Sequence, residues 1–342
     1  MSRPRSIPLL IAAVTLVAVA GCGTAGSTPL PETSDSVPVS SPPPLSPVAP
    51  STSRALTSPA PPPPGSTVPG TADPAIPDAP SGPTETMVWV PAGDHRVPGT
   101  LALPARTAGQ RFPAVLLLHG DLSNRNENGN LFGRLAAALS ARGIASLRID
   151  FAGSGDSEEP DLALDYPGMV HDATSSLSYL GQQGVLDPSR LAVLGLSRGG
   201  SIAATVAGTI PGVAALVSWS GAVSNGVDEE PDAHQEAREN GFASVPDGDH
   251  DFRLSLSWFD TIEASHPLDD VAGYTGPVLA VVGSEDDIVP PAVSDVFIAT
   301  VASKDKTLHT IEGADHGFTG EQEYGDEAVA ITTDWLAARL VR

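Results

Sequence analysis

The sequence predicts an α/β domain built on a doubly wound, mostly parallel sheet of about eight strands with a cap insertion. Short apolar or β-branched runs alternate with amphipathic stretches from residue 86 to residue 342. Several central runs are continuously apolar, as expected of parallel strands whose two faces are both covered by helices. A long acidic segment of weak periodicity, residues 221–272, separates two of the strands and is expected to sit over the ends of the sheet as a cap over the functional site.

The predicted elements follow one another in alternation, which favours crossover connections and therefore a parallel sheet. Strands are expected at residues 87–90, 100–103, 114–118, 145–151, 191–194, 213–219, 278–282 and 307–311. Helices are expected at residues 131–142, 167–180, 201–207, 292–301 and 328–340. The segment 86–342 is about the size of one large single-core domain.

Residues 1–21 have the layout of a secretory signal peptide. A short basic start precedes an apolar stretch, residues 7–20, which is too short to span a bilayer comfortably. The sequence Val-Ala-Gly then leads to Cys22, the only cysteine of the chain, and this ending resembles a bacterial lipobox. The resemblance implies cleavage before Cys22 and lipidation of its sulfur, with an ordinary signal peptide followed by a chance cysteine as the alternative. A lipidated Cys22 would anchor the protein to the outer face of the cytoplasmic membrane.

Residues 22–85 have the composition of a disordered linker. More than half of the chain's 34 prolines fall in this stretch, and Ser, Thr and Ala make up most of the rest. Large apolar side chains are too few to offset the entropy of ordering, so the segment is expected to remain unfolded. Its proline content makes it an extended, semi-rigid spacer between the anchor and the domain.

The charge balance excludes one class of partner. The chain carries 41 acidic and 18 basic residues, a formal net charge of −23. Phosphate binding needs clustered Lys and Arg, so a nucleic-acid partner is not expected. The same acidity disfavours adhesion to an anionic lipid surface through charge, which leaves the lipid anchor as the predicted membrane contact.

A candidate nucleophile stands at the end of the predicted strand 191–194. Gly195, Ser197 and Gly199 form the spacing G-x-S-x-G, and a helix-like stretch follows directly. Tight turns alone also favour glycine and serine, so the motif needs partners before it indicates chemistry. Its strand–turn–helix context is the one that exposes a serine hydroxyl near a helix N-terminus, where developing negative charge is stabilised.

The required base and its orienting acid follow later in the chain. His316 stands in a glycine-flanked loop after the last predicted strand. The loop after strand 278–282 offers the three carboxylates of Glu285, Asp286 and Asp287. An imidazole can take the proton of Ser197, and a buried carboxylate would hold the imidazole in the correct tautomer.

Serine, acid and histidine occur here in the order of the α/β-hydrolase family, and the chain resembles that family. More narrowly, it is similar to bacterial cinnamoyl and feruloyl esterases and to their dienelactone-hydrolase-like and serine-aminopeptidase-like relatives. The matching stretches are LLLHG at 116–120, RIDFAGSGDS at 148–157, GLSRG at 195–199, and TLHTIEGADHGF at 307–318. The stretch 283–290, G-x-x-D-x-x-V-P, is similar to the family's acid loop, which implies Asp286 as the acid.

The resemblance also implies an oxyanion hole made of two backbone N–H groups, those of Asp121 and Arg198. Backbone donors suit this role because they need no reorganisation when charge develops. Two residues depart from the family pattern: Leu196 stands where a histidine is usual, and Asp121 where an apolar or aromatic residue is common. We expect the Asp121 carboxylate to turn away from the oxyanion and pair with Arg198 or a neighbour.

Together these features predict a secreted, lipid-anchored serine hydrolase that cleaves small carboxylic esters through an acyl-enzyme. The substrate is expected to be a small soluble ester, and the mechanism needs neither a metal nor an organic cofactor. A peptidase or amidase of the same fold is one alternative, because the triad chemistry is shared. A non-catalytic cell-surface binding protein on a hydrolase scaffold is another. Nothing in the sequence indicates the oligomeric state.

Overall fold

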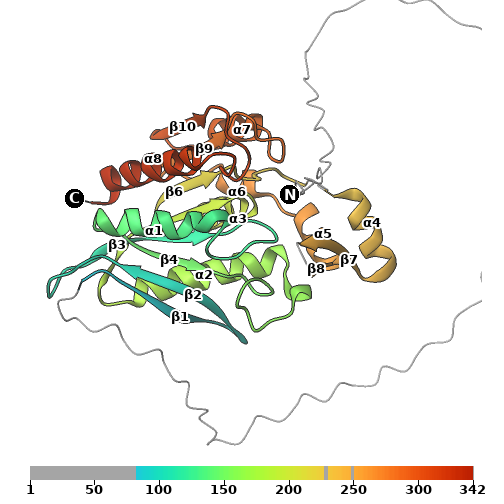
Figure 1. Ribbon diagram of the computed structural model, residues 1–342, viewed down its shortest axis with the longest axis horizontal. Coiled ribbons are helices and arrows are strands. Elements are labelled where there is room, and N and C mark those ends of the chain that lie inside the picture. The colour runs from blue at the N-terminus through green and yellow to red at the C-terminus, as the bar shows by residue number, and fades with distance from the viewer. Residues whose placement is uncertain (1–81, 227–229, 248–249, 342) are drawn as a thin grey trace, which may run out of the picture. The chain divides into compact units, whose positions relative to one another are not determined.

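The structure is a computed structural model that describes residues 82–226, 230–247 and 250–341 (Figure 1). The predicted signal peptide, Cys22 and nearly all of the predicted linker lie outside the described residues. Among the helices that the structure describes, none is long and apolar enough to cross a membrane.

Eight strands form one sheet in the order β1-β2-β4-β3-β5-β6-β9-β10. Only β2 runs against its neighbours, since it pairs antiparallel with both β1 and β4 while all the other pairs are parallel. The strands are β1 (Thr84–Ala92), β2 (His95–Leu103), β3 (Phe112–Leu118), β4 (Ala145–Ile149), β5 (Leu186–Leu196), β6 (Val213–Trp219), β9 (Val278–Gly283) and β10 (Lys306–Ile311). The predicted doubly wound, mostly parallel sheet is therefore confirmed, and each predicted strand overlaps an observed one.

Helices cover both faces of this sheet (Figure 1). Buried residues of α1 (Leu131–Ala141) and α8 (Gln322–Leu340) belong to the core on one face. Buried residues of α2 (Tyr166–Gln182), α3 (Arg198–Thr209), α6 (Pro267–Val271) and α7 (Pro291–Thr300) belong to the core on the other face. Two short 3-10 helices, η1 (Asn128–Asn130) and η2 (Asp161–Ala163), lie in loops.

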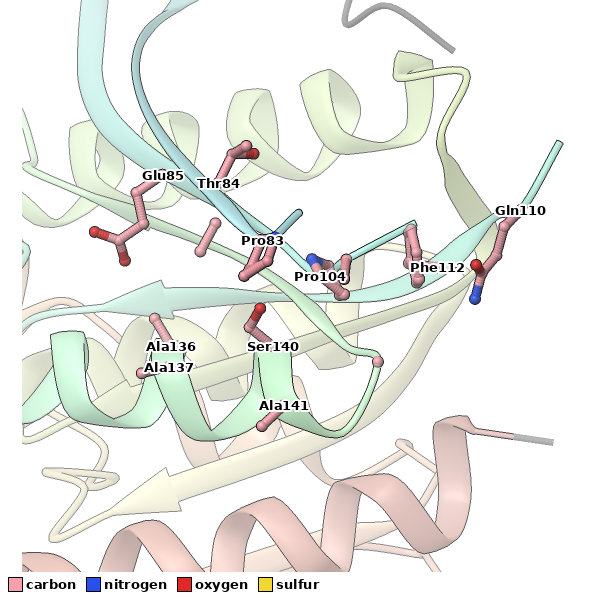
Figure 2. Close-up of a pocket in the computed structure, with 13 residues that line it drawn as sticks. Pro83, Thr84, Glu85, Pro104, Gln110, Phe112, Ala136, Ala137, Ser140 and Ala141 are labelled. Atoms are coloured by element: carbon pink, nitrogen blue, oxygen red, sulfur yellow. The ribbon is translucent and has the colours of Figure 1, made fainter. Parts of the chain in front are cut away.

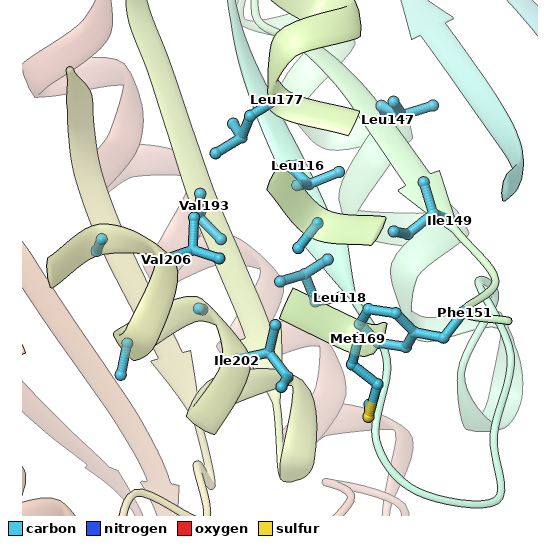
Figure 3. Close-up of a cluster of buried hydrophobic side chains, with 14 of the residues drawn as sticks. Leu116, Leu118, Leu147, Ile149, Phe151, Met169, Leu177, Val193, Ile202 and Val206 are labelled. Carbon is cyan, nitrogen blue, oxygen red and sulfur yellow. The ribbon is translucent and has the colours of Figure 1, made fainter. Parts of the chain in front are cut away.

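Strand β3 shows why the central runs are apolar throughout. Leu116 and Leu118 point to the core shared with α2 and α3, where Met169 and Ile202 meet them (Figure 3). The alternate residue Leu117 belongs to the core under α1 and α8. Because successive side chains of a strand point to opposite faces, both sets must be apolar when both faces are covered. Full burial of each leucine contributes about 1.5–3 kcal/mol.

The acidic segment 221–272 contains short elements that its weak periodicity did not reveal. They are α4 (Pro231–Asn240), a hairpin of β7 (Phe242–Asp247) and β8 (His250–Ser255), α5 (Leu256–Glu263), and α6. The Arg253 guanidinium in β8 donates to Asp161 in η2 at 2.8 and 3.0 Å. This ion pair fastens the hairpin to the loop that precedes α2, and it lowers the pKa of the Asp161 carboxyl.

Candidate active site

Ser197 is the single residue between the end of β5 and the start of α3. Its backbone has φ 53° and ψ −120°, a strained conformation for a residue with a side chain. The turn is held by the Ser197 N–H, which donates to the Trp219 carbonyl at 2.9 Å, and by the Ser197 carbonyl, which accepts from Ala222 N–H at 3.0 Å. Strained residues of this kind gather at functional sites, because the surrounding structure has to enforce them.

The two glycines of the G-x-S-x-G spacing are required by close backbone contacts. A Cβ at Gly195 would overlap with the Gly199 carbonyl oxygen, and a Cβ at Gly199 would overlap with the Leu118 carbonyl oxygen. Both obstacles are backbone atoms, which cannot move aside cheaply. The sequence spacing is thus explained by the packing of β5, α3 and the end of β3.

His316 lies in the loop after β10, and its Nδ1 is 2.9 and 3.0 Å from the two carboxylate oxygens of Asp286. The Asp286 side chain is fully buried, whereas Glu285 and Asp287 are exposed. Asp286 Oδ1 also accepts from the backbone N–H groups of Ile288 and Val289 at 3.1 and 2.8 Å. A carboxylate held in this way can fix both the orientation and the tautomer of an imidazole.

The loops that carry His316 and Asp286 are bonded to each other. Gly313 N–H donates to Ser284 Oγ at 2.8 Å, and Glu285 N–H donates to the Ala314 carbonyl at 3.0 Å. Because β9 and β10 are parallel neighbours, their carboxyl ends meet at one edge of the sheet, and these bonds keep the two loops in register.

Ser197 and His316 line the same cavity of about 350 Å³. Gly120, Asp121 and Glu127 line it too, so the structure gathers the predicted nucleophile, base and oxyanion loop around one space. This is the size of a small ligand pocket. Asp286 supports His316 from the buried side of its ring.

The predicted oxyanion loop lies directly against the nucleophile. A Cβ placed on Gly120 would sit 3.1 Å from the Cβ of Ser197. Arg198 Nε donates to Asp121 Oδ2 at 3.1 Å, so the Asp121 carboxylate has the predicted partner. The Arg198 side chain is 2% exposed, and its guanidinium carbon lies 5.8 Å from the centre of the Trp258 ring in α5. Trp258 therefore places the inserted segment beside Arg198, the residue that follows Ser197.

Two residues under this loop hold its backbone, and only one of them is apparent from the sequence. His119 is expected there from the His-Gly pair of the LLLHG stretch, and its Nδ1 lies 2.7 Å from the Gly120 carbonyl oxygen. Glu127 has no motif that marks it, yet its Oε1 accepts from the Gly120 N–H at 2.6 Å. An acidic residue in a loop otherwise rich in Asn and Gly is the only signal that could have drawn attention to it.

A second, larger cavity of about 570 Å³ lies near the amino end of β3 and the last turn of α1 (Figure 2). Its lining includes Pro83, Pro104, Phe112 and Ala141, and none of the predicted site residues is among the described residues around it. Ser197 follows the carboxyl end of β5, so this cavity is separate from the candidate active site.

The strand order, with a serine on the turn after its central strand β5, defines an α/β-hydrolase fold, and with it the class of serine hydrolases. A sequence model of the prolyl oligopeptidase family (Peptidase S9) matches residues 131–341, more than half of the chain. The chain belongs to this family. The predicted α/β-hydrolase classification is thereby confirmed.

The curated relatives carry no further functional information. A protein described as uncharacterized in Mycobacterium tuberculosis is 30% identical over 210 residues, which cover 61% of this chain and 65% of the relative. This chain therefore spans less than two thirds of the relative's length.

Solved structures with low sequence identity share the fold. Est1E from Butyrivibrio proteoclasticus, solved with bound ferulic acid, has a TM-score of 0.61 at 19% identity and covers 74% of this chain and 98% of its own. An esterase domain from Rhodothermus marinus has a TM-score of 0.57 at 21% identity, with coverage of 75% and 98%. Dienelactone hydrolase from Anabaena variabilis has a TM-score of 0.54 at 21% identity, with coverage of 76% and 100%.

Proposed function

We propose that this protein hydrolyses small carboxylic esters through an acyl-enzyme formed on Ser197. The observation that carries the proposal is the pairing of His316 with the buried carboxylate of Asp286 on the cavity that Ser197 lines. Ser197 and His316 line one cavity and Asp286 holds His316 from its buried side, which supplies the nucleophile, the base and the orienting acid that acyl transfer requires.

In the proposed mechanism, Ser197 Oγ attacks the ester carbonyl carbon while His316 Nε2 takes the hydroxyl proton. Asp286 keeps the other ring proton on Nδ1 and stabilises the imidazolium that forms. The backbone N–H groups of Arg198 and Asp121 stabilise the tetrahedral oxyanion. Collapse expels the alcohol, which receives its proton from His316, and water then releases the acid by the same steps in reverse.

The size of the cavity supports a small substrate. About 350 Å³ lies at the lower end of the range for ligand pockets, which suits a short or single-ring acyl group better than a long lipid chain. The solved structure of Est1E, which shares the fold, contains bound ferulic acid, an aromatic acid. Short aliphatic and hydroxycinnamoyl esters are therefore the substrates that we propose to test first.

A p-nitrophenyl ester series from acetate to decanoate tests the proposal with wild type, Ser197→Ala and Ser154→Ala. Ser154 is a matched control, because it also sits between two glycines after a strand, and its buried hydroxyl has no hydrogen-bond partner among the described residues. We expect the rate to fall to background only in Ser197→Ala and to be highest with the short esters. Equal rates above background for wild type and Ser197→Ala would remove Ser197 from the mechanism, and background rates in both proteins would favour a binding protein.

Peptide hydrolysis is the second candidate, and the match to the prolyl oligopeptidase family favours it. The same residues can attack an amide, so the distinction depends on the leaving group and the pocket. Aminoacyl and prolyl p-nitroanilides, compared with the matching p-nitrophenyl esters, separate the two activities. A kcat/KM for an anilide equal to or above that for its ester would identify a peptidase.

We further propose that the mature protein is anchored to the outer face of the cytoplasmic membrane through lipidated Cys22. The basic start, short apolar stretch and Val-Ala-Gly-Cys ending of the sequence support this location. Metabolic labelling with a fatty-acid alkyne should mark wild type but not Cys22→Ala, and the variant should leave the membrane fraction. Equal labelling of both proteins would contradict the anchor.

A further inference from the structure

We propose that Glu127 is a positioning residue of the oxyanion hole, which aims the Asp121 N–H by holding the backbone of Gly120. This inference rests on the proposed function, and it adds a residue that neither the chain's motifs nor its resemblance to known hydrolases indicates. Glu127 acts through Gly120 and does not itself transfer a proton.

Gly120 is held on both sides by buried side chains. Its N–H donates to Glu127 Oε1 at 2.6 Å, and its carbonyl oxygen accepts from His119 Nδ1 at 2.7 Å. His119 is 1% exposed and Glu127 is 8% exposed, so water competes little for either bond.

Hydrogen bonds at both ring nitrogens fix the tautomer and the orientation of His119. A carbonyl oxygen can only accept, so Nδ1 must carry the proton that Gly120 receives. Nε2 is then the accepting nitrogen, and Phe151 N–H donates to it at 3.2 Å. The neutral imidazole is thus fixed between two backbone groups.

The two bonds determine where the next N–H points. In a trans peptide the C=O of one residue and the N–H of the next point in opposite directions. His119 holds the Gly120 carbonyl, which directs the Asp121 N–H to the opposite side of that peptide plane. Glu127 prevents Gly120 from rotating about its own backbone bonds, and Gly120 packs against Ser197, where the oxyanion would form.

Glu127 is itself held firmly. Its second carboxylate oxygen, Oε2, accepts from Ser123 Oγ at 2.8 Å. Its backbone has φ 58°, a region that residues with a side chain rarely adopt, and its N–H donates to the Asn124 carbonyl at 3.0 Å. Although Glu127 lines the cavity, both of its oxygens already accept protein hydrogen bonds, which suits support of a loop better than acid–base chemistry.

Two conservative variants distinguish the effect of side-chain length at residue 127 from the effect of its charge. Glu127→Asp keeps the charge but withdraws the carboxylate by one methylene, about 1.5 Å. Glu127→Gln loses the charge but keeps an acceptor oxygen for Gly120, and its amide group can donate to the Ser123 hydroxyl. Loss of a whole oxyanion donor lowers kcat by about 10²–10³-fold, so a misaimed donor should cost about 10–100-fold.

The test measures kcat and KM on p-nitrophenyl acetate, and Ki for a trifluoromethyl ketone that forms a tetrahedral adduct with the serine. We expect Glu127→Asp to lower kcat by about 10–100-fold and raise Ki by the same factor, with KM within about 2-fold. Glu127→Gln should stay within about 2-fold of wild type in all three. A purely structural role would not make kcat and Ki change in parallel.

The opposite pattern, with Glu127→Gln impaired and Glu127→Asp active, would show that charge matters and overturn the inference, as would unchanged kcat in both. Ser123→Ala is a second route should Glu127→Asp not fold. Ser123→Ala removes only the hydrogen bond to Glu127 Oε2. We expect it to lower kcat by about 3-fold and to raise Ki by the same factor. Unchanged kcat and Ki would count against the positioning role of Glu127. Absence of Ser197-dependent turnover in wild type would instead refute the proposed function and this inference with it.

Discussion

Replacement of Asp286 by Asn changes the tautomer of the proposed base, His316, while the loop around residue 286 keeps its hydrogen bonds. Both backbone donors of the loop, Ile288 N–H and Val289 N–H, bond to Oδ1 of Asp286. An asparagine that keeps its amide oxygen at this position retains both bonds and places its NH₂ where Oδ2 stands, 2.9 Å from His316 Nδ1. The reverse orientation would leave two backbone donors facing an NH₂ group, so it is disfavoured.

An NH₂ group at Oδ2 favours the wrong tautomer of His316, because the amide oxygen left at the Oδ1 position, 3.0 Å from Nδ1, already accepts two backbone N–H groups. In that tautomer Nδ1 accepts, the ring proton lies on Nε2, and Nε2 can no longer take the proton of Ser197. The same loss of tautomer control in a serine protease triad lowers kcat by about 10⁴-fold, which corresponds to about 5.4 kcal/mol of transition-state stabilisation. We expect a loss of this order for Asp286→Asn, with little change in unfolding temperature.

The assay is kcat on p-nitrophenyl acetate for Asp286→Asn beside two charge-matched controls, Glu285→Gln and Asp287→Asn. The Glu285 side chain is exposed and away from the cavity lining, so we expect Glu285→Gln to stay within about 3-fold of wild type. Asp287 is exposed but lines the cavity, so we expect Asp287→Asn to lose far less activity than Asp286→Asn. A kcat for Asp286→Asn within tenfold of wild type would refute the tautomer argument. A loss in Asp287→Asn as large as that in Asp286→Asn would refute the choice of acid.

Two further predictions concern the framework of the site. Gly199→Ala should lower the free energy of unfolding in urea by about 3 kcal/mol, because the new Cβ overlaps with backbone carbonyls. The control Gly184→Ala, which has open space around its Cβ, should leave that free energy nearly unchanged. Equal free energies of unfolding for the two variants would contradict the packing of the turn. Hydrogen bonds from Ser189 and Arg190 lower the pKa of Asp187 to about 2, below its ordinary value of 3.8. Ionised Asp187 therefore contributes stability above about pH 4 that is lost as the pH falls toward 2. The Tm of Asp187→Asn should therefore fall less steeply than that of wild type between about pH 4 and pH 2. An equally steep fall of Tm in both proteins would refute the contribution of Asp187 to acid stability.

The parts of the site that depend on backbone topology could be predicted from the sequence. Ser197 follows a continuously apolar run and precedes a helix, and this pattern alone places it at the carboxyl edge of a parallel sheet. His316 follows another strand of the same sheet, and so must meet the same edge. The need to keep negative charge from the oxyanion predicts that Asp121 pairs with Arg198 or a neighbour, and the structure contains the pair with Arg198.

The parts that depend on loop geometry could not be predicted from the residues alone. Glu285, Asp286 and Asp287 are adjacent in sequence, and only the turn of the loop buries one carboxylate and exposes the other two. Glu127 reaches Gly120 across a loop whose path depends on an unusual backbone angle. In the inserted segment, α4 buries only His234 and Ala237 along its 10 residues and α6 has only 5 residues, so neither gives a clear apolar period.

The most direct measurement is to map the residue that reacts with a fluorophosphonate probe by tandem mass spectrometry of the wild-type protein. We predict a single adduct on Ser197, absent in Ser197→Ala and formed at least about 100-fold more slowly in Asp286→Asn, because the probe needs the same base and oxyanion hole as an ester. An adduct on another residue, or equal labelling of wild type and Ser197→Ala, would contradict the assignment of Ser197 as the nucleophile.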